Sequence, residues 1–134
     1  MRLHVESFTF RTRGPIDIVN ITPKVKAIVE NSGIKNGIAH IFAPHATGII
    51  SLTEYEEGLL NDIRSLLEKL VPSKEEYEHP SNAHAHLRSI IFSPEKTVPI
   101  INGRLALGTW QSIVFIETDI YPRTRTIIVH IIGE

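Results

Sequence analysis

The stretch TVPIINGRLALG, residues 97–108, decides the fold class because it contains the strongest hairpin signal in the chain. Asn102 and Gly103 stand between two β-type runs, TVPII and RLALGT. An Asn-Gly pair favours a two-residue hairpin loop, since both central positions of that turn require positive φ. The stretch therefore predicts two antiparallel strands joined by a tight turn.

Further β-type runs lie on both sides of this hairpin. LHVESFTF at 3–10 alternates polar and apolar residues, and a turn at Gly14 and Pro15 predicts that it forms a hairpin with IDIV at 16–19. The other runs are GIAHIFA at 37–43, IISLT at 49–53, QSIVFIET at 111–118 and RTIIVHII at 125–132. Strands are thus gathered toward both ends of the chain.

Two helices are predicted between these groups of strands. Residues 23–32 follow Thr22, a possible cap, and begin with Pro23, which suits the first position of a helix. Residues 54–71 contain one broad apolar stripe that ends before Pro72. A polar loop then leads to a short helical turn capped by Asn82. The pattern predicts one α+β domain over 1–134, with a largely antiparallel sheet and two main helices packed on it.

Composition narrows the function classes. The 134 residues are 42% hydrophobic and 22% charged, with a formal net charge of -1, so we expect a globular protein that does not bind nucleic acid nonspecifically. No apolar run approaches the roughly 20 residues that span a bilayer, and we expect a cytoplasmic protein without membrane contact. Because the chain has no cysteine, a transition metal would need imidazole and carboxylate ligands.

Histidines are the first candidates for chemistry. HPSNAHAHLRS, residues 79–89, holds three of the seven histidines in the chain, and His45 lies at a strand break. His79 precedes the short helical turn and can converge with His86, so we predict a metal site formed by His45, His79 and His86. On a helix His84 points about 200° away from His86, so only one of the two can easily face a given site. The alternative is that all are ordinary loop and helix-end residues.

Carboxylates and arginines add two further sets of candidates. Glu54 and Asp62 could orient a ligating histidine or act as general bases, although a helix start and a solvated helix face explain them better. The arginine candidates for phosphate binding are Arg88, Arg123 and Arg125. Their alternative is ion pairing with a nearby carboxylate, Glu117 or Asp119, within or between subunits.

Common catalytic motifs are absent. The sequence has no G-x-S-x-G nucleophile elbow, no P-loop and no G-x-G-x-x-G after a strand. Trp110, in the LGTWQ run, is interpreted as a core residue or an interface anchor.

Four stretches together, PHATG, YEHPSNAHAHLRS, GRLALGTWQSIVFIETD and PRTRTIIV, resemble the YjbQ-type family from about residue 38 to residue 133. The resemblance implies a compact α+β fold that assembles as a homotrimer, with sites at subunit boundaries. It also implies a secondary thiamine-phosphate synthase activity, in which a thiazole phosphate and a pyrimidine pyrophosphate are joined with loss of pyrophosphate.

The family pattern places functional residues on this chain. The matched positions are His45, His79, His86, Glu54, Asp62, the run 108–111, Arg123 and Arg125. One departure is Thr53, which stands where the family usually has asparagine, so a role for that amide is lost or altered.

The leading hypothesis is a trimeric enzyme that binds a divalent metal, expected to be zinc, and a small phosphorylated molecule. The alternatives are a non-enzymatic module that binds a metal or a phosphorylated metabolite, and a purely structural role for the histidines.

Overall fold

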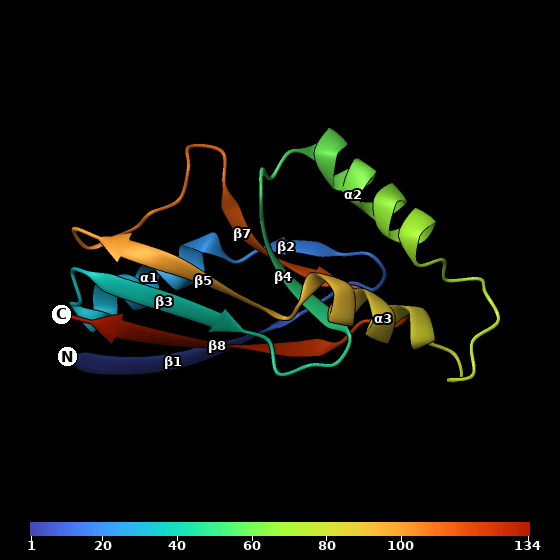
Figure 1. Cartoon of the computed structure of the whole chain (residues 1–134), viewed down its shortest axis with the longest axis horizontal. Helices are drawn as coiled ribbons and strands as arrows, with labels where there is room; N and C mark the ends of the chain where they lie inside the picture. Colours follow the sequence, from blue (N-terminus) through green and yellow to red (C-terminus); the bar gives the residue numbers. More distant parts are fainter.

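The computed structural model describes residues 1–134 and contains two antiparallel sheets and three helices, which confirms the α+β class (Figure 1). The strands are β1 (Arg2–Arg11), β2 (Ile18–Asn20), β3 (Gly37–Phe42), β4 (Gly48–Thr53), β5 (Glu95–Ile101), β6 (Arg104–Leu105), β7 (Ser112–Glu117) and β8 (Thr124–Gly133). The helices are α1 (Thr22–Ser32), α2 (Glu57–Leu70) and α3 (Ala83–Phe92). None of the helices is both long and apolar enough to cross a bilayer.

The large sheet has the strand order β1-β8-β3-β5-β6 and the small sheet the order β2-β7-β4. Strand β8 lies between β1 and β3 and pairs with both, so the two ends of the chain meet at one end of the molecule. The Met1 amino group contacts the Glu134 side chain at 2.7 Å.

Strand β7 joins the two parts of the core because both of its faces are buried. Successive side chains of a strand point to opposite faces. Ile113 and Phe115 accordingly pack with α1 and the inner face of the large sheet, while Val114 and Ile116 pack against α2. The small sheet is therefore a middle layer between the large sheet and α2.

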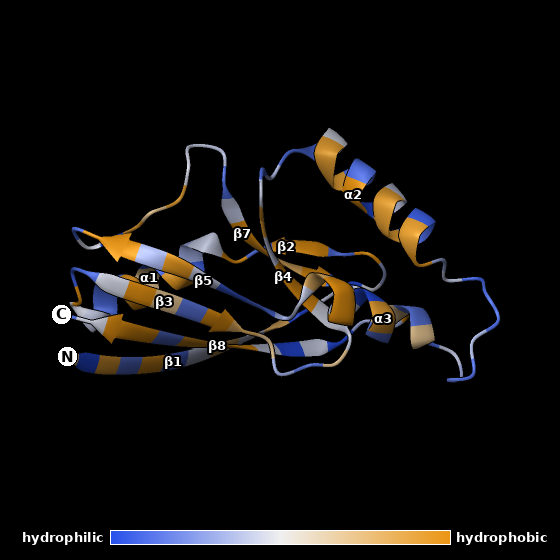
Figure 2. Ribbon diagram, in the orientation of Figure 1, coloured by the Kyte–Doolittle hydropathy of each residue, from blue (hydrophilic) through white to orange (hydrophobic).

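The outer face of the large sheet is not covered by any helix. Leu3 and Val5 of β1, Ile38 and Phe42 of β3, and Ile101 of β5 are exposed. Figure 2 shows hydrophobic and hydrophilic residues alternating along β1 and β3. Leu3 and Ile38 both pair with Ile132 of β8, so these exposed apolar residues share the outer face of the sheet, while Ala39 and Ile41 of β3 face the core.

Several sequence predictions are confirmed. Helix α1 starts one residue before the predicted 23–32 span, and Asn102 and Gly103 have the positive φ angles of the predicted turn, 52° and 79°. Helix α2 starts later than predicted, because the Glu56 carboxylate accepts hydrogen bonds from the Gly58 and Leu59 N–H groups and caps it there. The expected short turn after Asn82 is the ten-residue helix α3.

The predicted hairpin between 3–10 and 16–19 is wrong. Strand β1 pairs with β8, and β2 pairs with β7 in the other sheet. The physical reason is the turn between them: the Asp17 carboxylate accepts the Arg13 N–H at 2.9 Å and pairs with its guanidinium at 3.0 Å. This closed turn carries the chain from one sheet to the other.

Candidate functional site

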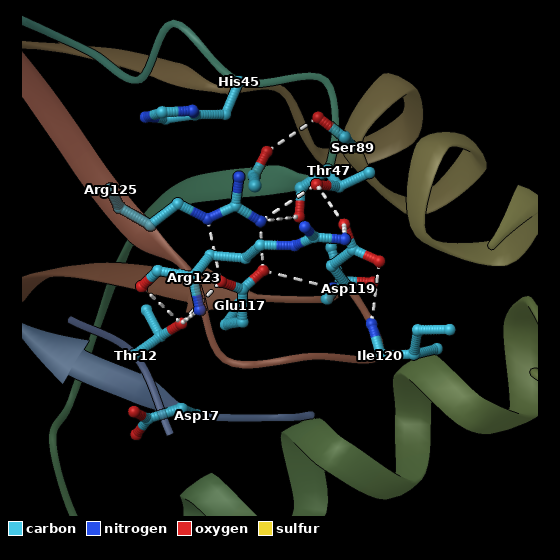
Figure 3. A network of polar contacts seen from close by, with 12 residues as sticks. Thr12, Asp17, His45, Thr47, Ser89, Glu117, Asp119, Ile120, Arg123 and Arg125 are labelled. Atoms are coloured by element: carbon cyan, nitrogen blue, oxygen red, sulfur yellow. Dashed lines mark hydrogen bonds and ion pairs between the residues drawn. The ribbon is translucent and has the colours of Figure 1, made fainter. Parts of the chain in front are cut away.

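A buried ion pair lies where β7 and β8 approach the loop before β4 (Figure 3). The Arg125 guanidinium donates to both carboxylate oxygens of Glu117, with Nε to Oε1 at 2.8 Å, and also to the Thr47 hydroxyl at 2.9 Å. The Thr12 hydroxyl donates to Glu117 at 2.7 Å. Arg125 thus forms the ion pair that the sequence left open as its alternative role, and two of its three side-chain nitrogens are used inside the chain.

Asp119 continues this network toward the surface. Its carboxylate accepts from the Thr47 hydroxyl at 3.2 Å, the Asn82 amide at 3.2 Å and the Ile120 N–H at 2.8 Å, and it pairs with Arg123 at 3.1 Å. Burial acts to raise the pKa of Asp119, but these hydrogen bonds and the arginine charge outweigh it and lower the pKa. Asp119 is therefore held as a carboxylate.

The two remaining arginine candidates differ in exposure. Arg88 is buried, and all three of its side-chain nitrogens donate within the chain, to Val71 O at 2.8 and 3.1 Å, to Thr118 and to Glu68. Arg88 therefore ties α3 to the end of α2. The Arg123 side chain is 43% exposed, so its guanidinium has donors left for a ligand while it contacts Asp119.

His79 and His86 come together, as the sequence predicted. Their ring centroids are 4.9 Å apart and the rings meet edge to face. The His79 Nε2 lies 3.1 Å from the Asn82 amide oxygen, which can only accept, so Nε2 is the donor of this hydrogen bond, and in the neutral ring Nδ1 is the nitrogen with the free lone pair. A cavity of about 360 Å³ lies beside the two rings, lined also by Glu78 and Leu87.

His45 is placed differently. Its Nε2 accepts the Thr126 N–H at 2.8 Å, which puts the ring proton on Nδ1. Burial, aided by the charge of Arg125, lowers the pKa of His45 and keeps the ring neutral. No group of three histidine or acidic side chains lies close enough to share a metal ion within the chain, so His45 does not join His79 and His86 there.

His84 is the buried histidine of α3, only 3% exposed, and its Nδ1 has no hydrogen-bond partner. Burial lowers its pKa, and the nearby Arg88 charge acts in the same direction. The family resemblance ranked His84 below the other three histidines, because the family pattern does not fix its position. The helix places it on the buried face next to Arg88.

The predicted carboxylates lie away from the histidine pair. Glu54 is exposed just beyond the end of β4, about 20 Å along the strand from Thr47. Asp62 is exposed on α2. Neither side chain makes a hydrogen bond. Asp62 lies on a solvated helix face, as its alternative explanation predicted, whereas Glu54 lies in the segment before α2 and not at the start of the helix.

Comparison with known proteins identifies the family of this chain. The model of the family described as UPF0047 protein YjbQ-like matches residues 6–134. This chain belongs to the YjbQ-like family. It is 42% identical to a UPF0047 protein of Methanothermobacter thermautotrophicus over all of this chain and 95% of that one. It is also 42% identical to a UPF0047 protein of Archaeoglobus fulgidus, over 90% of this chain and 95% of the relative.

Solved structures share this fold. A YbjQ-like protein of unknown function from Sulfolobus solfataricus is 37% identical, and the match covers 99% of each chain with a TM-score of 0.96. A hypothetical protein from Aeropyrum pernix is 34% identical, over 98% of this chain and 99% of that chain, with a TM-score of 0.94.

The histidine pair of this YjbQ-like chain offers two imidazole rings in edge-to-face contact, with their centroids 4.9 Å apart. No third histidine or acidic side chain lies close enough to share a metal ion with both rings. A catalytic zinc typically has three protein ligands, so the pair lacks one donor.

Sequence reasoning missed the polar residues that hold this pair. Asn82 was expected to cap α3, and it does precede the helix, but its side chain makes no capping bond and instead joins His79 to Asp119. Thr47 was not singled out, although it connects Asp119 to Arg125. The only available signal was that each lies within three residues of a predicted metal ligand, Asn82 after His79 and Thr47 after His45.

Proposed function

We propose that this YjbQ-like protein is a homotrimeric, metal-binding enzyme that joins a thiazole phosphate to a pyrimidine pyrophosphate with loss of pyrophosphate. The supporting observation is a continuous path of polar contacts between a predicted metal ligand and a predicted phosphate ligand. His79 contacts Asn82 at 3.1 Å, Asn82 donates to Asp119 at 3.2 Å, and Asp119 pairs with Arg123 at 3.1 Å. We therefore propose that the two kinds of ligand belong to one site.

In this proposal His79 and His86 hold the metal. Asn82 keeps the proton on His79 Nε2, so that Nδ1 presents a lone pair. His45 of the same chain does not lie close enough to share an ion with the pair, and its Nε2 accepts the Thr126 N–H. In this proposal the third donor comes from a neighbouring copy.

In this proposal Arg123 binds a phosphate. Arg88 and Arg125 do not contact the ligand, and their hydrogen bonds inside the chain keep the surrounding residues in place. The exposed part of the Arg123 guanidinium binds the pyrophosphate, and its positive charge partly neutralises the negative charge that develops on the leaving group. A bound divalent metal would supply further charge neutralisation at the same group.

We also propose that three copies assemble. Exposed apolar side chains on the outer face of the large sheet, including Leu3, Val5 and Ile38, favour burial against another protein surface. Sedimentation equilibrium would measure the mass in solution. Three times the chain mass of 15.1 kDa is expected, and a monomer at all concentrations would contradict this part of the proposal.

Metal analysis tests the ligand assignment. Protein purified without a histidine tag would be dialysed against zinc, and the metal content would be measured for the wild type, His79→Ala, His86→Ala and His4→Ala. His4 is a matched control because it lies on β1 and contacts only Glu6. Loss of metal in the first two variants alone is expected. Undiminished metal in both would refute the assignment.

One observation favours the non-enzymatic alternative, a module that binds a metal or a phosphorylated metabolite. Glu54 and Asp62, the predicted bases, lie away from the histidines. Incubation with the two thiamine precursors separates the alternatives: formation of thiamine phosphate at a rate that falls in His79→Ala supports the enzyme, and metal binding without product supports the module.

A further inference from the structure

A second cavity lies far from the histidine pair, between α1 and the turn that leads into β6. Its volume is about 470 Å³, which is within the range of small-molecule sites. Helix α1 and helix α3 lie toward opposite ends of the molecule, so the two cavities are separate (Figure 1). Ala27 and Val29 of α1 and Leu105 of β6 give the cavity an apolar wall.

Positive charge gathers around this wall. Lys26 and Arg104 line the cavity from opposite sides, and Lys35 lies at its margin, within 3.4 Å of the position that a side chain at Gly103 would occupy. None of the three cations forms an ion pair or a side-chain hydrogen bond. Glu30 is the one carboxylate of the lining. The excess is therefore about two positive charges without partners.

The backbone around the cavity is fixed by hydrogen bonds. The Gly103 N–H donates to Lys35 O at 2.8 Å, and the Asn102 N–H donates to the Asn36 side chain at 3.3 Å. Gly103 has φ near 79°, a conformation that side chains rarely adopt. The turn is thereby held against the loop after α1, and Arg104 is held opposite Lys26.

We propose that this cavity binds a small organic phosphate monoester. The apolar body of the ligand lies on Ala27, Val29 and Leu105, and its phosphate lies between Lys26 and Arg104. A phosphate monoester carries a charge of about -1.5 to -2 at pH 7, which matches the excess of unpartnered cations better than a single carboxylate does. The fork of the arginine suits two phosphate oxygens at once. This inference does not depend on the metal site.

Amide chemical shifts of the full chain, measured by NMR with phenyl phosphate as the probe, test the proposal. Saturable shifts are expected at Gly103, Leu105 and the 26–30 segment. Arg104→Ala and Lys26→Ala remove one charge-assisted contact each, so each should weaken binding about 10-fold or more. Both side chains are exposed, so the variants are expected to fold, which their spectra check directly.

Lys24→Ala is the matched control, because Lys24 is exposed on the same helix and does not line the cavity; its affinity should be unchanged. His79→Ala should also bind normally, which separates this proposal from the metal site. Benzoate should bind more weakly than phenyl phosphate. The proposal is overturned if phenyl phosphate causes no saturable shifts, if neutral phenol binds as well, or if the two cavity variants bind like the wild type.

Discussion

The pair Arg125–Glu117 and the pair His79–His86 lie in one hydrogen-bonded network but differ in how far their polar atoms are already used. Arg125 and Glu117 are buried and bond to each other and to threonine hydroxyls. The histidines border a cavity, and neither the His86 ring nor His79 Nδ1 has a partner. Polar groups whose hydrogen bonds are all made inside the fold fix the positions of the strands and loops that carry them, whereas groups at a cavity without hydrogen-bond partners remain available for a ligand.

Breaking the buried pair should have the largest effect on stability. Arg125→Ala leaves Glu117 as a buried charge without its cation, and we expect a loss of about 3–5 kcal/mol in the free energy of unfolding. Urea denaturation measures it. Arg123→Ala is the control, since its partly exposed pair with Asp119 should contribute less than about 1 kcal/mol. Equal losses in both variants would contradict the distinction between the two regions.

Removing the link between the two regions should affect binding more than stability. Asn82→Ala deletes the contact that orients His79, and changes of this kind typically lower metal affinity about 10- to 100-fold. Zinc titration against a competing chelator measures the affinity. An unchanged affinity in Asn82→Ala would show that the network does not serve the histidine pair.

Acidification should weaken the fold through His84, which is buried, and His45, which is half-buried. Burial lowers the pKa of both histidines, so below the ordinary histidine pKa of 6.5 the unfolded chain binds protons that the folded chain does not. The free energy of unfolding should therefore fall as the pH decreases below 6.5, by at most about 1.4 kcal/mol per pH unit for His84 and by less for the partly solvent-screened His45.

Denaturation at several pH values between about 5 and about 8 measures this slope. The double variant His45→Gln and His84→Gln should have a smaller slope, because glutamine does not titrate. A slope as steep as that of the wild type would assign the effect to other groups.

The smallest effect on stability is expected at Trp110. Its side chain is 73% exposed, which rules out the core interpretation and leaves the interface interpretation as a prediction. Trp110→Ala should change the free energy of unfolding by no more than about 0.5 kcal/mol at protein concentrations where the chain is monomeric. Sedimentation should show weaker assembly in the same variant, and unchanged assembly would remove the tryptophan from the interface.

Local signals predicted local structure well. Pro23 and the apolar spacing after it predicted α1 within one residue, and Asn102-Gly103 predicted the β5–β6 hairpin. Pairing between distant strands could not be predicted in the same way. Strand β1 pairs with β8 across more than a hundred residues, and nothing in residues 3–19 indicates that the Asp17 turn changes sheets.

As with the fold, the parts of the candidate site that could be predicted were those formed by residues close together in the sequence. His79 and His86 are seven residues apart, and their convergence follows from a loop that ends at a helix. The partner of His45 was not predictable, because Thr126 N–H comes from a strand 81 positions away. The sequence could not show which arginine remains free to bind a ligand, because only the fold determines that Arg88 is buried and Arg123 is not.

The central place of β8 in the large sheet has a consequence for biosynthesis. Strand β8 follows all the other strands in chain order, and it fills the gap between β1 and β3. Until it has been translated, both neighbours have unpaired backbone edges that are prone to intermolecular pairing. A chain whose translation stops before β8 is therefore a strong candidate for aggregation and chaperone capture, even when all the other strands are present.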